Sequence, residues 1–131
     1  IFGGVVATRI DPKWLLVSAL VAEIISMLTL AVADNTAAIA LFAVAEGYAI
    51  GMCYFATIML LVNYFGPREN SEILGTLNMV TTIAMIGPVL GGFVGDTFGS
   101  FAMVFQGYSI LVFLALLFAA TMQPPRHPST N

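Results

Sequence analysis

The stretch AAIALFAVAEGYAIGMCYFATIMLLV at residues 37–62 is an apolar run in which Glu46 is the only charged side chain. A helix needs roughly 20 consecutive, mostly apolar residues to cross the hydrocarbon core of a bilayer. Three more stretches meet that requirement, at residues 14–33, 73–95 and 101–122. The sequence therefore predicts an all-α membrane protein with four transmembrane helices.

The composition of the chain also indicates a lipid environment. Hydrophobic residues make up 60% of the 131 residues and charged residues 8%, whereas a soluble domain carries about 25% charged residues. The net charge of −3, without a basic run, excludes nucleic-acid binding. Cys53 is the only cysteine, which excludes an internal disulfide and a cysteine-based zinc site. The lipid bilayer is the expected environment, and we expect no metal and no other cofactor.

The connections between the predicted spans are short, so consecutive helices should run antiparallel. All basic residues then fall on one side of the membrane: Arg9, Lys13, Arg68 and Arg126. The connections on the other side hold Asp34 and Asp96 and contain no Lys or Arg. Because cytoplasmic loops carry the excess of Lys and Arg, we predict that the basic side is cytoplasmic, together with the polar tail at residues 123–131.

The third span carries glycines on one helical face, four residues apart: Gly87, Gly91 and Gly95. Pro88 lies among them and should bend the helix, because proline removes a backbone donor. The second span offers the shorter pair Gly47 and Gly51. Small residues let helices approach closely in lipid. These faces serve either static packing or the sliding of one helix bundle against another during transport.

Short motifs occur in register with these spans. In chain order they are YFGPR at residues 64–68 (with Gly66 and Arg68), Gly75, GPVLGG at residues 87–92 (with Gly91 and Gly92), and DTFGS at residues 96–100 (with Asp96 and Gly99). This series resembles the end of transporters of the major facilitator superfamily. The branch of the monocarboxylate and oxalate/formate carriers is the most similar.

The start of the chain is similar to a degraded copy of the cytoplasmic loop motif of that superfamily, Gly-x-x-x-Asp-Arg-x-Gly-Arg-Arg. The matching residues are Gly4, Arg9 and Lys13. Thr8 stands where the motif has Asp, Asp11 where it has Gly and Pro12 where it has Arg. The charge relay attributed to the full motif is therefore not expected in this loop.

The resemblance implies that residues 1–131 form a partial C-terminal transporter domain. They would be the end of helix eight and then helices nine to twelve of a twelve-helix carrier, with the glycine-rich helix facing the other half. The first residues, from Ile1 on, resemble a helix that has already begun. We therefore expect a fragment that is inactive without the missing N-terminal half of the same carrier.

Two carboxyl side chains lie near the middle of predicted spans, Glu23 and Glu46. An Asp, Lys or Arg at the centre of a helix costs roughly 2.5–3.5 kcal/mol on insertion scales, and a Glu should also be costly. No Lys or Arg lies within the four spans, so each Glu is either protonated or paired with another part of the carrier. The resemblance places Glu46 on a cavity-lining helix, which makes it the main candidate for binding a proton or substrate. A protonated Glu46 bonded to a neighbouring helix is the alternative.

Glu23 is a further candidate for binding a proton or substrate. The resemblance places it on a peripheral helix, where a neutral carboxyl bonded to Ser26 or to another helix's backbone is the simpler interpretation. Among neutral polar residues, Tyr48 and Asn78 are the substrate candidates. Interhelical hydrogen bonding is the default for the others.

The predicted function is secondary active transport of a small solute by alternating access, coupled to an ion gradient. The resemblance suggests a small organic anion such as a monocarboxylate. The alternative is a free-standing four-helix membrane subunit for assembly or regulation. An enzyme is not expected, because the spans hold no His and the two Glu residues lie on separate helices. The short loops are compatible with a bacterial inner membrane protein.

Overall fold

The computed structural model describes residues 11–66 and 70–123, which form five α-helices and no strand within those ranges. The helices are α2 (Pro12–Ala31), α3 (Thr36–Phe65), α4 (Asn70–Ile83), α5 (Ile86–Phe98) and α6 (Ala102–Thr121). The end of a further helix, predicted for the start of the chain, lies outside the described residues.

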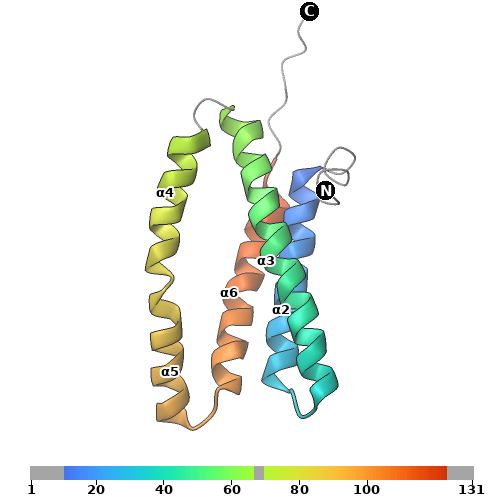
Figure 1. The fold of residues 1–131 in the computed structure, drawn as a ribbon, viewed down its shortest axis with the longest axis vertical. Coiled ribbons are helices and arrows are strands. Elements are labelled where there is room, and N and C mark those ends of the chain that lie inside the picture. Colours follow the sequence, from blue (N-terminus) through green and yellow to red (C-terminus); the bar gives the residue numbers. More distant parts are fainter. Residues whose placement is uncertain (1–10, 67–69, 124–131) are drawn as a thin grey trace, which may run out of the picture.

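Four helical units of the described chain are long and apolar enough to cross a membrane. Helices α2, α3 and α6 are three of them, and α4 and α5 together make the fourth, at Ser71–Phe98. Figure 1 shows α4 and α5 stacked end to end in one column beside the other three helices. The predicted all-α fold with four membrane-spanning units is therefore confirmed.

Polar side chains begin the first two helices. The Asp11 carboxylate accepts a hydrogen bond from the backbone N–H of Lys13 at 3.0 Å, and the Asn35 amide oxygen accepts one from the N–H of Ala38 at 2.9 Å. Such caps satisfy donors that the first turn of a helix leaves free. Helix α2 thus begins at Pro12 rather than at residue 14, and α3 at Thr36 rather than at residue 37.

Glycine ends two of the helices. Gly66 after α3 has a φ of 82° and Gly99 after α5 a φ of 68°, a region that residues with a Cβ rarely adopt. With Gly99 as its terminator, α5 continues to Phe98. Asp96, which the sequence analysis assigned to a connection, therefore lies in the last turn of α5.

The predicted third span is interrupted at Ala84 and Met85. Pro88 has no N–H to donate to the carbonyl of Ala84, four residues back, and the proline ring clashes with that carbonyl. The Ala84 carbonyl instead accepts from the N–H of Gly87 at 2.8 Å. At the position where Pro88 predicts a bend, the structure thus has a break between α4 and α5.

Helix α2 packs along α3 and α6, while the α4–α5 column contacts α3 through α4 and α6 through α5. The buried positions of the three packed helices are occupied mostly by small side chains: Ala19, Ser26, Ala49, Ala56, Ser109 and Ala119. Small residues permit close backbone approach, which drives helix association in lipid. Large apolar side chains such as Val44 and Phe118 point outward and are 73% and 75% exposed, as a lipid-facing surface requires.

The helix ends divide into two groups (Figure 1). The α2–α3 and α5–α6 connections lie at one end of the bundle, and α3 ends and α4 begins at the other. The Tyr64 hydroxyl near the end of α3 donates to the carbonyl of Gln123, just after α6. This contact holds the ends of α3 and α6 together on the side that carries Lys13.

Candidate functional site

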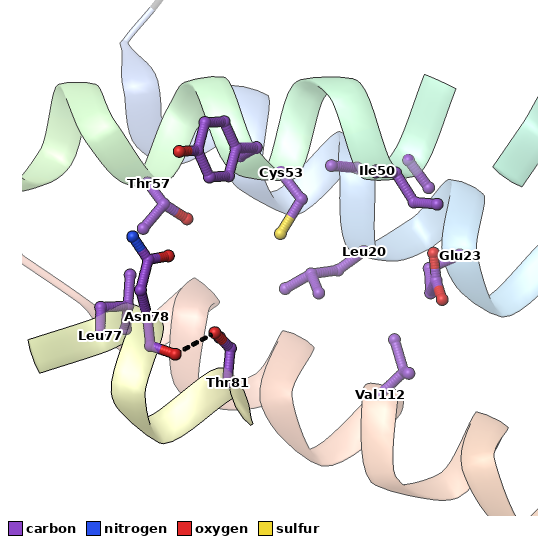
Figure 2. A pocket seen from close by; sticks show the side chains of 12 residues that line it. Leu20, Glu23, Ile50, Cys53, Thr57, Leu77, Asn78, Thr81 and Val112 are labelled. Carbon is purple, nitrogen blue, oxygen red and sulfur yellow. Dashed lines mark hydrogen bonds between the residues drawn. The ribbon is translucent and has the colours of Figure 1, made fainter. Parts of the chain in front are cut away.

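A cavity of about 500 Å³ lies between α4 and helices α2, α3 and α6, and is called the α4 cavity below. Its polar lining comes from three helices: Glu23, Cys53, Tyr54, Thr57, Asn78 and Thr81. Figure 2 shows the Asn78 amide directed toward Thr57 and the Cys53 thiol directed into the space. The Thr81 hydroxyl donates to the backbone carbonyl of Asn78 at 2.8 Å. The amide of Asn78 is therefore the main polar group that α4 offers to a solute.

A second cavity of about 860 Å³ lies between α5 and the same three helices, and is called the α5 cavity. Glu23, Ile50 and Val112 line both cavities, so the two adjoin along the bundle. The α5 cavity also receives Glu46 from α3 and an aromatic wall from α6. No Lys, Arg or His of the described residues lines either space.

Glu46 is half-buried at the interface of α3 with α2. Its Oε2 atom lies 2.5 Å from the Ser26 hydroxyl oxygen, and Ser26 is fully buried. The same hydroxyl lies 2.9 Å from the backbone carbonyl oxygen of Glu23. Glu46 is thus held by a side chain of the neighbouring helix while it faces the α5 cavity.

Glu23 lies at the border of the two cavities and is half-buried. The partner expected for its carboxyl was Ser26 or the backbone of another helix. In the structure the Ser26 hydroxyl instead contacts the Glu46 carboxyl and the Glu23 backbone. Both membrane carboxyls therefore face the same cavity, although they lie on separate helices.

The two neutral candidates lie in different places. Asn78 lines the α4 cavity. Tyr48 lines neither cavity, and its hydroxyl lies 3.0 Å from the hydroxyl of Ser18 on α2. The structure therefore gives Tyr48 an interhelical hydrogen bond and brings Asn78, Glu23 and Glu46 together around adjoining spaces.

The wall that α6 contributes to the α5 cavity was not predicted from the sequence. Its main side chains share one helical face: Phe101, Val104, Phe105, Tyr108 and Val112. Their spacing of three and four residues places neighbours on the same side of a helix. That spacing was readable from the sequence, but only packing shows that this side faces the cavity rather than lipid.

The three spaced glycines of α5 lie against α6. A Cβ added at Gly87 would lie 3.2 Å from the Tyr108 hydroxyl oxygen, and one at Gly91 would lie 3.3 Å from Val104. At Gly95 it would lie 2.5 Å from the Phe101 ring. The glycine face thus has a packing partner within the described chain.

The other glycines differ in their surroundings. A Cβ added at any of these would meet nothing within 4 Å: Gly47, Gly51, Gly75 and Gly92. Gly92 lines the α5 cavity. The Gly47–Gly51 face therefore meets no helix among the described residues.

Two of the residues matched to the cytoplasmic loop motif, Gly4 and Arg9, lie outside the described ranges, as does the loop residue Arg68. Lys13 lies in the first turn of α2, and its ammonium nitrogen is 5.8 Å from the centroid of the Trp14 ring. A cation within about 6 Å of an aromatic ring is attracted by the electrons of the ring face. Asp11 and Pro12, which depart from the motif, serve instead as the cap and first residue of α2.

Four apolar helical units with a lipid-facing exterior define an integral, multi-pass membrane protein. Carboxyls that face cavities between the helices are typical of a solute pathway. The family model described as Major Facilitator Superfamily matches residues 1–131. The chain therefore belongs to the major facilitator superfamily of membrane transporters, which confirms the resemblance at the level of the superfamily. Comparisons with curated proteins and with solved structures find no match.

Proposed function

We propose that this chain is the C-terminal part of a proton-coupled secondary carrier in which Glu46 binds the coupled proton. The observation that carries the proposal is the position of Glu46, which faces the α5 cavity while its Oε2 atom lies 2.5 Å from Ser26. A carboxyl in an apolar span is costly unless it is neutral or paired. A role in taking up and releasing the coupled proton would explain why a carboxyl is retained in this apolar span.

The solute that we propose is a small organic anion such as a monocarboxylate, in keeping with the motifs at residues 64–100. Among the described residues no basic side chain lines either cavity. A carboxylate must therefore enter together with a proton, or meet a basic residue of the N-terminal half of the carrier. The acidic lining favours an organic amine as the second candidate, because an ammonium group pairs directly with a carboxylate.

The basic ends of the helices support an orientation with the C-terminus in the cytoplasm. Lys13 lies at the same end of the bundle as the end of α6, and Arg9, Arg68 and Arg126 are expected there from the sequence. Cytoplasmic loops of membrane proteins carry this excess of Lys and Arg. We assign the membrane as a bacterial plasma membrane, in keeping with the short connections.

The test uses the full-length carrier in vesicles with an imposed pH gradient, supplied with radiolabelled propionate or with a radiolabelled organic amine. We expect the gradient to drive propionate above its equilibrium distribution, and Glu46→Gln to abolish that accumulation. Glu72→Gln is the matched control, because Glu72 is exposed in the first turn of α4 and lines neither cavity. Normal gradient-driven uptake by Glu46→Gln would contradict the role of Glu46. Uptake of the amine alone would replace the proposed solute class.

A further inference from the structure

Ser26 occupies an unusual position for a polar side chain. It is 0% exposed, and its single hydroxyl lies within hydrogen-bond distance of two oxygen atoms. These are the Glu23 backbone carbonyl oxygen at 2.9 Å and the Glu46 carboxyl oxygen at 2.5 Å. A hydroxyl has one proton to donate and two lone pairs that accept. Which of the two contacts uses the Ser26 proton depends on whether Glu46 carries a proton of its own.

A protonated Glu46 makes both contacts hydrogen bonds at once. The carboxylic acid donates to the Ser26 oxygen, and Ser26 donates to the carbonyl of Glu23, three residues back along α2. Back-bonding of this kind is a common arrangement for serine within helices. In this state Ser26 both accepts and donates a hydrogen bond, and Glu46 carries no net charge.

An ionised Glu46 requires a different arrangement of the same atoms. The carboxylate only accepts, so the Ser26 hydroxyl turns its proton toward Glu46 and releases the Glu23 carbonyl. That carbonyl lies within α2 and can still accept a backbone hydrogen bond of the helix. The separation of 2.5 Å falls in the range of a hydroxyl that donates to a charged oxygen. By rotating its hydroxyl, Ser26 can therefore hydrogen-bond Glu46 in both protonation states.

The surroundings of Glu46 offer few other groups for this purpose. The remaining titratable side chains that line the α5 cavity are Glu23 of α2 and Tyr108 of α6. Helix α5 contributes only apolar side chains and glycines to it, and no Lys, Arg or His of the described residues lines it. The Tyr108 hydroxyl donates to the carbonyl of Gly87 at 2.7 Å. Ser26 is thus the one side chain of the described residues that hydrogen-bonds the Glu46 carboxyl.

We propose that Ser26 is a positioning residue for Glu46, whose rotating hydroxyl holds that carboxyl at the α2–α3 interface both with and without its proton. The inference rests on the proposed function, in which Glu46 gains and loses a proton during transport. Without the Ser26 hydroxyl the ionised carboxylate loses its donor and the neutral acid loses its acceptor. The carboxyl would then turn toward water in the α5 cavity in either state.

Infrared spectroscopy of the full-length carrier in lipid bilayers tests the inference directly. The difference between the wild type and Glu46→Gln isolates the bands of the Glu46 carboxyl, both the C=O stretch of the acid at low pH and the carboxylate stretches at high pH. We expect Ser26→Ala to move both sets of bands, with the acid stretch going to higher wavenumber because its hydrogen bond is lost. Unmoved bands in Ser26→Ala, or no acid band at any pH, would overturn the inference.

Ser109→Ala provides a matched control. Ser109 is also a nearly buried helical serine, 7% exposed, and its hydroxyl donates to the carbonyl of Phe105 four residues back at 2.8 Å. It lines neither cavity, so its removal should leave the Glu46 bands in place. The infrared result does not depend on transport. If Ser26→Ala shifts the Glu46 bands but Glu46→Gln still shows proton-driven uptake, the proposed function is wrong and the Ser26–Glu46 contact stands. If the bands do not move but Glu46→Gln loses proton-driven uptake, the proposed function stands and the contact is wrong.

Discussion

The hydroxyl of Tyr108 on α6 donates a 2.7 Å hydrogen bond to the carbonyl of Gly87, at the start of α5. Gly87 immediately precedes Pro88, the residue that interrupts the α4–α5 column. A side chain at Gly87 would crowd the tyrosine, because its Cβ would lie 3.2 Å from the Tyr108 oxygen. The glycine admits the hydroxyl, and the hydroxyl fixes α5 against α6 where the column is broken.

Replacing Tyr108 by Phe should weaken this attachment. Hydrogen bonds between membrane helices contribute about 0.6 kcal/mol on average and up to about 1.7 kcal/mol, so we expect a loss of stability in that range. Denaturation of the reconstituted chain, followed by circular dichroism, measures it. Tyr54→Phe is the control, because the structure gives the Tyr54 hydroxyl no hydrogen-bond partner among the described residues. Equal losses in the two variants would show that the Gly87 contact contributes nothing.

A methyl group at Gly95 should be more disruptive than one at Gly92. The Gly95 Cβ would lie 2.5 Å from the Phe101 ring, whereas one at Gly92 would meet nothing within 4 Å. Overpacking of this kind costs about 1–3 kcal/mol. The same denaturation measurement should therefore show a destabilised Gly95→Ala, with Gly92→Ala close to the wild type. A fully stable Gly95→Ala would mean that the Phe101 ring, just before α6, does not lie against α5 or can move aside.

Pro88→Ala should repair the break between α4 and α5. The new N–H at residue 88 gives the carbonyl of Ala84 the helical donor that it lacks, and one hydrogen bond contributes about 0.5–1.5 kcal/mol net. Hydrogen exchange at Met85 and Gly87 should slow by up to about tenfold as the segment becomes regular helix. Pro12→Ala is the control, because proline at the first position of a helix removes a donor that has no partner anyway. Unchanged exchange in Pro88→Ala would assign the break to the packing of α6 instead.

The proposed orientation predicts which helix ends can be labelled from outside the cell. With Cys53 replaced by Ser, single cysteines are placed at Asp34, Ser100 or Gln123. A membrane-impermeant maleimide should label the first two in intact cells, because they lie in the α2–α3 and α5–α6 connections. Gln123 should react only after the membrane is opened. The reverse pattern would invert the orientation, and labelling of all three in intact cells would contradict a membrane-spanning bundle.

Several local features of the fold follow from single residues. Asp11 and Asn35 cap the helices that they precede, Gly99 ends α5 with a positive φ, and Pro88 breaks the third span. Each effect involves atoms no more than four residues apart. An effect of Pro88 on the third span was predicted from the sequence, but the exact helix ends were not. Capping residues extend a helix beyond its apolar run, and for this reason Asp96 lies in α5 rather than in a connection.

Which residues form the candidate site depends on contacts between distant parts of the chain. Ser26 meets Glu46 rather than the side chain of Glu23, and Tyr48 meets Ser18 instead of a cavity. An apolar span of this kind has little periodic contrast between its faces. The sequence therefore identified which polar residues lie in the membrane, and could not show which way each one points.

The amino-acid sequence alone establishes that the chain crosses a membrane with four helical units, because the free energy of placing about 20 apolar residues in lipid depends on composition and length. It also determined the break at Pro88, since the missing donor belongs to the residue itself. The packing of the helices was needed to show that Glu23 and Glu46 border the same cavity, that Ser26 connects α2 to α3, and that the glycines of α5 lie against α6. Those relations depend on how the helices rotate about their own axes, which the close packing of small side chains and a few hydrogen bonds determine.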